Sequence, residues 1–265
     1  RLISKLKQIY QIIFPIKVKT QEYFEKQIAW LPDYQYYSKD ALFYTITFRS
    51  FSIAMRGFGQ SDMLVYNQIF INEEYKIVKE ILCNFKRVKF YIIDAGANVG
   101  YTSLYFALGT NSQIIAVEPS SSNIEILNKN IELNNLGNRI EVKNCALSNN
   151  SNNKYKIENK FRDGLDWSTT TILDPNGKVN SITIEEIFIE KKWDFIDLLK
   201  IDIEGAEAEI FKSEVNFLSK TRVIAVEVHD EFISRIEIEL ILKNYGFIVF
   251  NFSELTIGVN ISLIS

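Results

Sequence analysis

From residue 88 onward, apolar segments of strand length alternate with segments of helical pattern, and this alternation constrains the fold more than any other feature of the chain. Strands are predicted over 88–94, 113–118 and 139–147, with helices over 101–108 and 121–134 between them. Parallel strands need long crossover connections, and a sheet that helices cover on both faces has strands that are apolar almost throughout. The alternation therefore predicts an α/β fold built on a parallel sheet.

A segment of short strand patterns over 148–194 interrupts the alternation. The alternation then resumes with a strand over 195–202, a helix from Gly205, a strand over 222–229 and a helix over 231–244. Two final strand patterns, over 247–252 and 259–265, have no helix between them. Because a short connection joins antiparallel strands, we expect a terminal antiparallel hairpin at the edge of the sheet.

The first 20 residues differ from the rest of the chain. Apolar residues recur there at helical spacing up to Pro15, with five basic residues and no acidic one. This pattern predicts a basic amphipathic helix, which either lies on a membrane surface or partner or packs on the domain. We favour packing, because charged faces are usually just solvated. Residues 21–87 are rich in aromatic side chains, with a strand pair predicted over 45–57 and a helix over 73–85.

Charge and cysteine content narrow the classes of function. The 30 basic and 33 acidic residues give a formal net charge of −3, whereas proteins that hold nucleic acid through its phosphates usually carry a basic excess. Cys83 and Cys145 are too few for a disulfide framework and lack the spacing of a zinc site. No apolar run approaches the roughly 20 residues that span a bilayer. We expect a cytoplasmic protein that does not bind nucleic acid.

A glycine turn, Asp94-Ala-Gly-Ala-Asn-Val-Gly100, joins the first strand of the alternation to its helix. Nucleotide-type ligands bind at the carboxyl ends of parallel strands, where this turn lies. Gly96 permits a tight turn and lets the backbone approach a ligand, and Gly100 lets the helix pack close to the strand. Glu118 ends the next strand, 18 residues after Gly100, in a position to accept hydrogen bonds from two ribose hydroxyls.

The middle position of the turn distinguishes two cofactors. A dinucleotide fingerprint, G-x-G-x-x-G, has a second glycine where the pyrophosphate meets the helix amino end. Here that position is Asn98. S-adenosylmethionine has no phosphate, and an acid such as Asp94 can hold its ammonium group directly or through water. The turn therefore favours S-adenosylmethionine over a dinucleotide, and a turn without a ligand is the remaining alternative.

Two later strands end in ionisable residues. Period-two alternation places Lys200, Asp202 and Glu204 on one face if the strand continues that far, and Glu227 and His229 share a face at the end of the following strand. If the two strands are neighbours, these groups converge on the same rim as the glycine turn. Unpaired charge at buried strand ends is costly, so the cluster indicates a site.

His229 is the only histidine in the chain. Beside Glu227 and across from Asp202 and Glu204, a neutral imidazole can take the proton from a hydroxyl as a sulfonium methyl is attacked. The acids either orient the imidazole or bind a divalent cation that acidifies the hydroxyl, and we assign no metal ligand. Capping of the next helix is the alternative for Glu204 and Glu207.

Four motifs in this order, DAGANVG, AVEP, KIDIEGAE and VEVH, resemble the FkbM family of S-adenosylmethionine-dependent methyltransferases. Residues 57–75 look like the opening segment of that family's domain, and 179–187 are similar to the strand and helix before its fourth core strand. The resemblance covers 57–265. It predicts a methyltransferase domain there and an N-terminal extension, an amphipathic helix and strands, over 1–56.

The resemblance implies a class I methyltransferase (Rossmann-like) fold, a seven-stranded sheet whose last strand is antiparallel. It also implies O-methylation of a hydroxyl on a sugar, glycan or polyketide-type small molecule, with S-adenosyl-L-homocysteine as the product. Two alternatives remain open. One is a divalent-metal-assisted small-molecule O-methyltransferase with Asp202 and Glu227 as ligands, and the other is a cofactor-binding scaffold without catalysis.

The resemblance finally implies roles for individual residues. The catalytic residues are His229, Glu204 and Asp202. The cofactor-binding residues are Asp94, Gly96, Ala97, Asn98 and Gly100 at the methionine end, Glu118 at the ribose, Asn144 and Ala146 near the adenine, and Ser61 and Asp62 closing over the cofactor. Class I enzymes often place an acid where Asn144 stands, so this chain departs from the pattern there. Asp163, Trp167 and Ser168 are candidate acceptor contacts.

Overall fold

The computed structural model describes residues 21–158 and 170–264. The chain divides into two compact units, residues 1–60 and 61–265, whereas the sequence predicts a boundary at residue 57. The predicted helix over 1–20 lies outside the described residues. Within the two described ranges, every helix is too short or too polar to cross a membrane.

The first unit contains a helix and a three-stranded antiparallel sheet in the order β1-β2-β3. Its elements are α2 (Gln21–Ala29), β1 (Tyr34–Lys39), β2 (Tyr44–Phe48) and β3 (Ser52–Met55). Alternate side chains of β2 are buried, as expected for a strand with one face on a core. The strand pair predicted over 45–57 is confirmed as β2 and β3.

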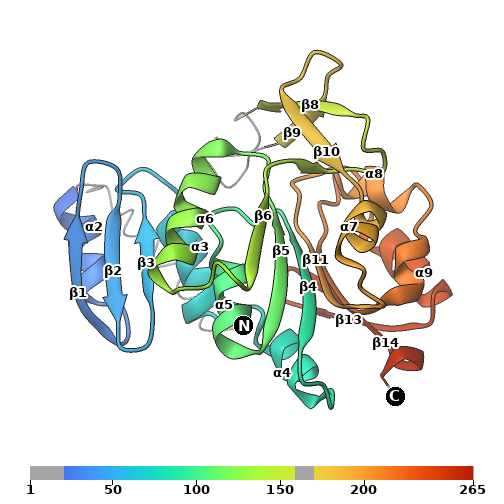
Figure 1. Cartoon of the computed structure of the whole chain (residues 1–265), viewed down its shortest axis with the longest axis horizontal. Coiled ribbons are helices and arrows are strands. Elements are labelled where there is room, and N and C mark those ends of the chain that lie inside the picture. The colour runs from blue at the N-terminus through green and yellow to red at the C-terminus, as the bar shows by residue number, and fades with distance from the viewer. Residues whose placement is uncertain (1–20, 159–169, 265) are drawn as a thin grey trace, which may run out of the picture. The chain divides into compact units, whose positions relative to one another are not determined.

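The second unit is built on a seven-stranded sheet with the order β13-β14-β12-β11-β4-β5-β6 (Figure 1). Its strands are β4 (Phe90–Ala95), β5 (Ser112–Val117), β6 (Ile140–Lys143), β11 (Ile196–Ile201), β12 (Thr221–Glu227), β13 (Phe247–Phe252) and β14 (Leu255–Asn260). Neighbours from β12 to β6 pair in parallel, and β14 is antiparallel to both β12 and β13. The predicted seven-stranded sheet with an antiparallel last strand is confirmed.

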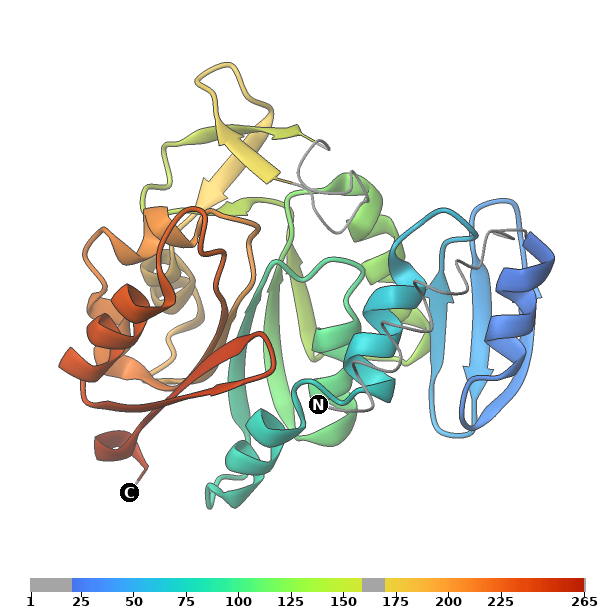
Figure 2. The same cartoon turned by 180° about the vertical axis from the view of Figure 1, so that it is seen from behind.

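Helices cover both faces of this sheet (Figures 1 and 2). The helices are α4 (Lys76–Asn84), α5 (Tyr101–Gly109), α6 (Ser121–Leu133), α7 (Ile184–Lys191), α8 (Glu207–Phe211) and α9 (Arg235–Asn244). The two views place α5 and α6 on one face and α7, α8 and α9 on the other. Leu199 and Ile201 of β11 belong to the core that also includes Ile187 of α7 and Ile238 of α9. Cover on both faces explains why all six residues of β11 are buried.

A short helical segment precedes the sheet and packs on α5. It consists of α3 (Asp62–Tyr66) and a π-helical turn, Asn67–Ile71. The rings of Tyr66 and Phe70 both contact the ring of Tyr101, each with centroids 6.2 Å apart. These aromatic contacts fix the segment next to the turn from which α5 starts.

Two predicted strands differ from the observed ones. The strand expected over 139–147 is in fact two, because β6 pairs with β5 whereas β7 (Ala146–Leu147) pairs with β10 in another sheet. Asn144 breaks it by donating its side-chain amide to the carbonyls of Glu118 and Pro119. The expected strand over 259–265 is also wrong, since β14 ends at Asn260 and a 3₁₀ turn follows.

The segment that interrupts the alternation forms a four-stranded sheet in the order β7-β10-β8-β9. It includes β8 (Lys154–Glu158), β9 (Thr170–Leu173) and β10 (Val179–Ile182), as the short strand patterns predict. Figure 1 shows β8, β9 and β10 beyond one end of the large sheet. Asp163, Trp167 and Ser168 lie outside the described residues.

Replacement of Gly96 by alanine should test the close approach on which the fold of the glycine turn depends. A Cβ at Gly96 would lie 1.7 Å from the backbone carbonyl oxygen of Asp202, and its φ of +76° disfavours any side chain. We expect Gly96→Ala to lower the free energy of unfolding by more than about 1 kcal/mol, measured by urea denaturation.

The matched control is Gly137→Ala, because a Cβ at Gly137 would have nothing within 4 Å and needs no left-handed φ. That variant should be neutral, or more stable by up to about 1 kcal/mol. Equal losses in the two variants would contradict the assigned contact.

Candidate functional site

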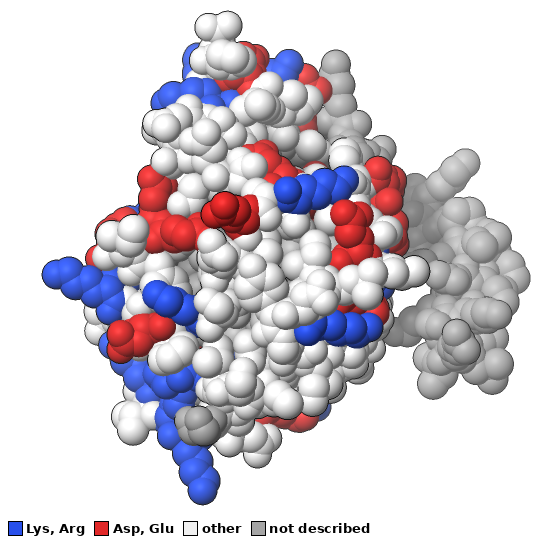
Figure 3. All heavy atoms as spheres, turned by 90° about the vertical axis from the view of Figure 1, so that its right-hand side faces the viewer, with Lys and Arg blue, Asp and Glu red and all other residues white. Residues whose placement is uncertain are grey.

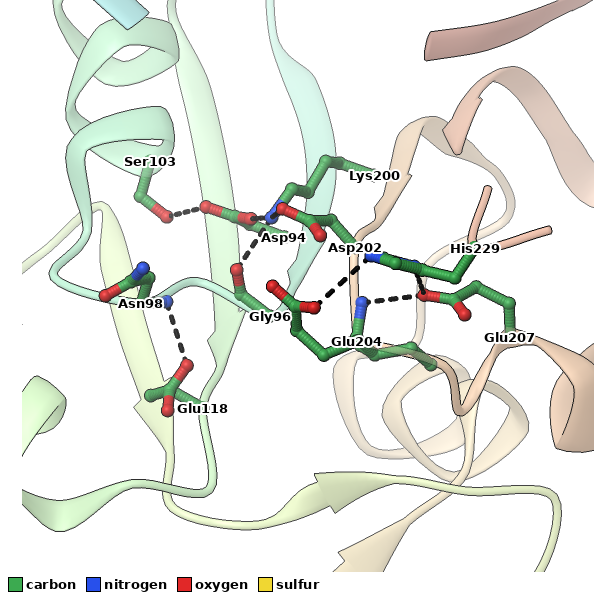
Figure 4. Close-up of polar contacts among 11 residues, drawn as sticks. Asp94, Gly96, Asn98, Ser103, Glu118, Lys200, Asp202, Glu204, Glu207 and His229 are labelled. Atoms are coloured by element: carbon green, nitrogen blue, oxygen red, sulfur yellow. Dashed lines mark hydrogen bonds and ion pairs between the residues drawn. The ribbon is translucent and has the colours of Figure 1, made fainter. Parts of the chain in front are cut away.

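Lys200 is a buried cation at the centre of the site (Figure 4). It pairs in register with Asp94 on the adjacent strand. Its Nζ donates to the carbonyl of Gly96 at 2.7 Å and lies 3.3 Å from Asp94 Oδ1 and 3.4 Å from Asp202 Oδ2. Burial disfavours the charged form, but the two carboxylates prevail and raise the pKa of Lys200 above its usual value. Lys200 thereby ties the ends of β4 and β11 to the glycine turn.

The glycine turn is fixed by bonds from both sides. The backbone N–H groups of Gly96 and Ala97 donate to the carbonyl of Val117, each at 3.0 Å. On the other side, Asp94 Oδ2 accepts a bond of 2.6 Å from the hydroxyl of Ser103 on α5. Gly100 begins α5 with a φ of +85°, and a Cβ there would collide with Leu127 of α6. The close packing predicted for Gly100 is therefore present.

Glu118 is buried where β5 ends. Its Oε2 accepts from the backbone N–H of Asn98 at 2.9 Å, and its Oε1 accepts from the backbone of Ser120 at 2.8 Å and the side chain of Asn123 at 3.3 Å. Burial is the largest influence on this carboxyl and raises the pKa of Glu118 above its usual value. The residue therefore holds the turn and the start of α6 together.

Two cavities meet at the glycine turn. The first, of about 50 Å³, is lined by Glu118 together with Ala146, Leu147 and Thr171 among others. Asn144 is not part of the described lining, because its side chain bonds to the chain between β5 and α6. The second cavity is larger, about 230 Å³. The residues that line both cavities are Gly96, Asn98, Asp202 and Glu204.

The second cavity is acidic. Five carboxylates line it, from Glu74, Asp202, Glu204, Glu227 and Glu254, with Lys200 as the one cationic side chain in its described lining. Burial, aided by Asp202 and Glu254, raises the pKa of Glu74 to about 7. The charge of Asp202, together with burial, raises the pKa of Glu227 to about 9. Like charges crowded together with little solvent cause both shifts.

His229 lies between two carboxylates (Figure 4). Its Nδ1 is 3.0 Å from Glu207 Oε1 and its Nε2 is 3.3 Å from Glu204 Oε2, with the residue 1% exposed. Burial alone would lower the pKa of His229, but the bonds to Glu204 and Glu207 prevail and raise it to about 11. The two carboxylates thus favour the protonated imidazole, whereas the sequence predicts a neutral one.

The elements that carry this cluster differ in part from those predicted. β11 ends at Ile201, so Glu204 reaches the cluster from a turn, with a φ of +52°, rather than from a strand face. Glu207 is the first residue of α8, yet it accepts from the backbone of Ile203 and contacts His229. The sequence leaves helix capping as the alternative for Glu207 and predicts no contact with His229. The spacing of three residues between Glu204 and Glu207 is the sequence feature that indicates that both side chains reach the same cluster.

Ser61 and Asp62 are buried at the start of α3. Neither belongs to the described lining of the two cavities. Their segment reaches the second cavity through later residues, Val65, Gln68 and Ile69. Their predicted contact with a cofactor stays a prediction.

Comparison with known proteins identifies relatives. Residues 94–249 match the family model described as the methyltransferase FkbM domain. Methyltransferase sdnD of Sordaria araneosa is 27% identical over 215 residues, an alignment that covers 69% of this chain and 81% of that protein.

Solved structures similar to this chain include a putative caffeoyl-CoA O-methyltransferase from Staphylococcus aureus, with 12% identity, a TM-score of 0.44 and coverage of 75% of this chain and 91% of that one. Another is a putative S-adenosyl-L-methionine-dependent methyltransferase from Methanococcus maripaludis, with 15% identity, a TM-score of 0.41 and coverage of 76% and 90%.

Removal of the Lys200 charge should destabilise the second unit strongly. Lys200→Met leaves Asp94 and Asp202 buried or half-buried without their cation. We expect a loss of about 3–5 kcal/mol in the free energy of unfolding, since a broken buried pair leaves uncompensated charge. Lys76→Met on α4 is the control, because its ion pair with Glu73 is exposed and should matter by less than about 0.5 kcal/mol. A similar loss in both variants would refute the central role of Lys200.

Proposed function

The chain belongs to the FkbM family of methyltransferases and is an S-adenosylmethionine-dependent methyltransferase; from this premise we propose that it methylates a hydroxyl group of a sugar, glycan or polyketide-type small molecule. The observation that carries the proposal is the meeting of two cavities at Gly96, Asn98, Asp202 and Glu204. We assign the cofactor to the first cavity, beside Glu118, and the acceptor to the second, so the shared residues mark the point of transfer.

The residues of the glycine turn fit S-adenosylmethionine. Asn98 lines both cavities, and its buried Oδ1 has no hydrogen-bond partner among the described residues, which suits the ammonium group of the cofactor. We propose that Asp94 and the turn hold the methionine end, Glu118 the ribose, and Ala146 the adenine. When bound, the cofactor supplies an electrophilic methyl group to an acceptor oxygen, whose proton must then be taken up.

The acidic second cavity supports a small acceptor rather than a nucleic acid. Its carboxylates oppose a polyanion, and Lys200 is already committed to Asp94 and Gly96. Figure 3 shows both signs of charge on the face that it presents, with acidic side chains in a band across the middle. Cys83 and Cys145 are both free thiols, which supports our proposal that the reaction takes place in the cytoplasm.

We propose that Asp202, Glu204 and His229 activate the acceptor hydroxyl at the junction of the cavities. Glu207 fixes the imidazole from behind, through Nδ1, so Nε2 is the atom that acts. A ring protonated on Nε2 has no lone pair for a proton. His229 can therefore take up the acceptor's proton only after Nε2 has passed its own proton to Glu204 or to solvent.

Loss of the Glu118 charge should weaken cofactor binding. A carboxylate that accepts from ribose hydroxyls contributes about 1.5–3 kcal/mol per charged hydrogen bond, so we expect Glu118→Gln to weaken S-adenosylmethionine binding roughly 10- to 100-fold in calorimetric titration. Glu125→Gln on α6 is the control, because Glu125 is exposed and should leave the affinity unchanged. A nicotinamide dinucleotide should not bind to the wild-type chain.

The affinity for the cofactor should also depend on pH. Because burial raises the pKa of Glu118, its carboxylate takes up a proton at a higher pH than an ordinary glutamate does. Binding should be fully present above this raised pKa and fall as the pH is lowered through it. Glu118→Gln should lose this dependence, and parallel pH curves for both proteins would exclude the assignment.

His229→Ala should bind S-adenosylmethionine as well as wild type does and lose methyl transfer. The measurement is formation of S-adenosylhomocysteine with a panel of hydroxylated acceptors, with the position of the new methyl group determined by nuclear magnetic resonance. Wild-type turnover in His229→Ala would remove the residue from the transfer site. A methyl group found on nitrogen or carbon would overturn O-methylation itself.

A further inference from the structure

Three side chains beside the point of transfer are arranged like the ligands of a metal ion. One ligand atom from each of Asp202, Glu227 and His229 lies within 4.8 Å of the others. Asp202 follows β11, and Glu227 ends β12, its parallel neighbour, with Ile201 opposite Val226. The convergence therefore follows from the register of two adjacent strands.

The imidazole is oriented as a metal ligand. Histidines that ligate metals almost always donate their other ring N–H to a carboxylate, a carbonyl or a water molecule. Here Glu207, which is 0% exposed, holds Nδ1 at 3.0 Å. Glu207 is in turn fixed by the backbone N–H of Ile203. The Nε2 of His229 is thereby directed to the side of the ring where Glu204 lies (Figure 4).

A fourth carboxylate gives an independent indication. Glu74 is 6% exposed, and its buried Oε2 has no hydrogen-bond partner among the described residues. It lies just before α4, far in sequence from the other three residues, yet it lines the same cavity as Asp202 and Glu227. A buried carboxylate oxygen without a donor is costly, and a cation or its bound water would satisfy it.

The charges that line the cavity call for a cation. Lys200 pairs with Asp94 and Asp202, so the crowded carboxyl groups of Glu74, Glu227 and Glu254 must keep protons to relieve their repulsion unless a cation binds. Carboxylates with one imidazole are a suitable ligand set for Mg²⁺ or Mn²⁺, which keep several waters in their coordination shell.

The geometry points to a divalent cation site, for Mg²⁺ or Mn²⁺, formed by Asp202, Glu227 and the Nε2 of His229. The cation displaces the proton of Nε2, which passes to Glu204 or to solvent, and takes the place of Glu204 as the partner of Nε2. Its role rests on the proposed function: it holds the acceptor hydroxyl in an open coordination position and lowers the pKa of that hydroxyl. Binding of the cation does not require the acceptor.

Manganese titration of the full chain tests this site directly. Electron paramagnetic resonance reports free Mn²⁺, and we expect one Mn²⁺ to bind per chain in the absence of cofactor and acceptor. Asp202→Asn and Glu227→Gln should each weaken binding by at least about tenfold, and Glu207→Gln by roughly 10- to 100-fold through loss of the histidine's orientation. Mg²⁺ should compete with Mn²⁺ for the same site.

Matched controls separate this site from general acidity and from misfolding. Asp230→Asn and Glu125→Gln remove exposed charges and should bind Mn²⁺ as wild type does. Glu227 lines only the second of the two cavities, so Glu227→Gln should lose Mn²⁺ and still bind S-adenosylmethionine, which shows that it is folded. Wild-type Mn²⁺ affinity in Glu227→Gln or Asp202→Asn overturns the assigned ligands.

The failure of this proposal is distinct from the failure of the proposed function. If the wild-type chain binds S-adenosylmethionine but no Mn²⁺, the cation site is overturned and the methyltransferase proposal stands. If it binds Mn²⁺ and the ligand variants do not, the site stands, whichever hydroxyl compound is the acceptor. If it binds neither, both proposals are overturned.

Discussion

The site depends on one buried cation, Lys200. Its Nζ joins the end of β11 to the carboxylate at the end of β4 and to the first glycine of the turn, through Asp94 and Gly96. There is no room for a side chain at Gly96, because a Cβ there would overlap the carbonyl of Asp202. A charge this deeply buried is stable only with partners in place. The positions of the turn, of Asp202 and of the junction between the cavities therefore follow from Lys200.

The parallel sheet explains why so many acids meet at one edge. Strands β4, β5, β11 and β12 all end at the same side, and each ends with or next to a carboxylate: Asp94, Glu118, Asp202 and Glu227. Two of these acids are neutralised within the protein, Asp94 by Lys200 and Ser103, and Glu118 by amide donors. Asp202 shares Lys200 with Asp94, Glu227 has no ion-pair partner among the described residues, and both line the second cavity. In our proposal, Asp94 and Glu118, whose hydrogen bonds are made within the protein, lie on the side of the cofactor, and Asp202 and Glu227 lie on the side of the acceptor.

The sequence predicts the parts of this site that depend on strand ends. Local periodicity is enough to predict the alternation of strands and helices. It is also enough to place Lys200 and Asp202 on one face, and their side chains are in contact in the structure. Glu207 lies three residues after Glu204, but its contact with His229, like the place of Glu74 in the acidic cavity, joins separate elements and becomes visible only in three dimensions. The break at Asn144 is hidden from the sequence for a similar reason. Its side chain replaces strand pairing by bonds to the turn after β5.

The surroundings of His229 decide how it can act. Carboxylates on both ring nitrogens hold a proton where a free base needs a lone pair, so the imidazole is poorly placed to start catalysis by itself. The same contacts suit a metal ligand, because Glu207 holds Nδ1 in place and Nε2 points toward the other carboxylates. The negative charge of this cluster can be balanced in two ways. Either a proton lies between Nε2 and Glu204, or a cation lies between Nε2, Asp202 and Glu227. A cation can in addition hold and acidify an acceptor hydroxyl, which a proton cannot do, and this favours the cation as the state that reacts.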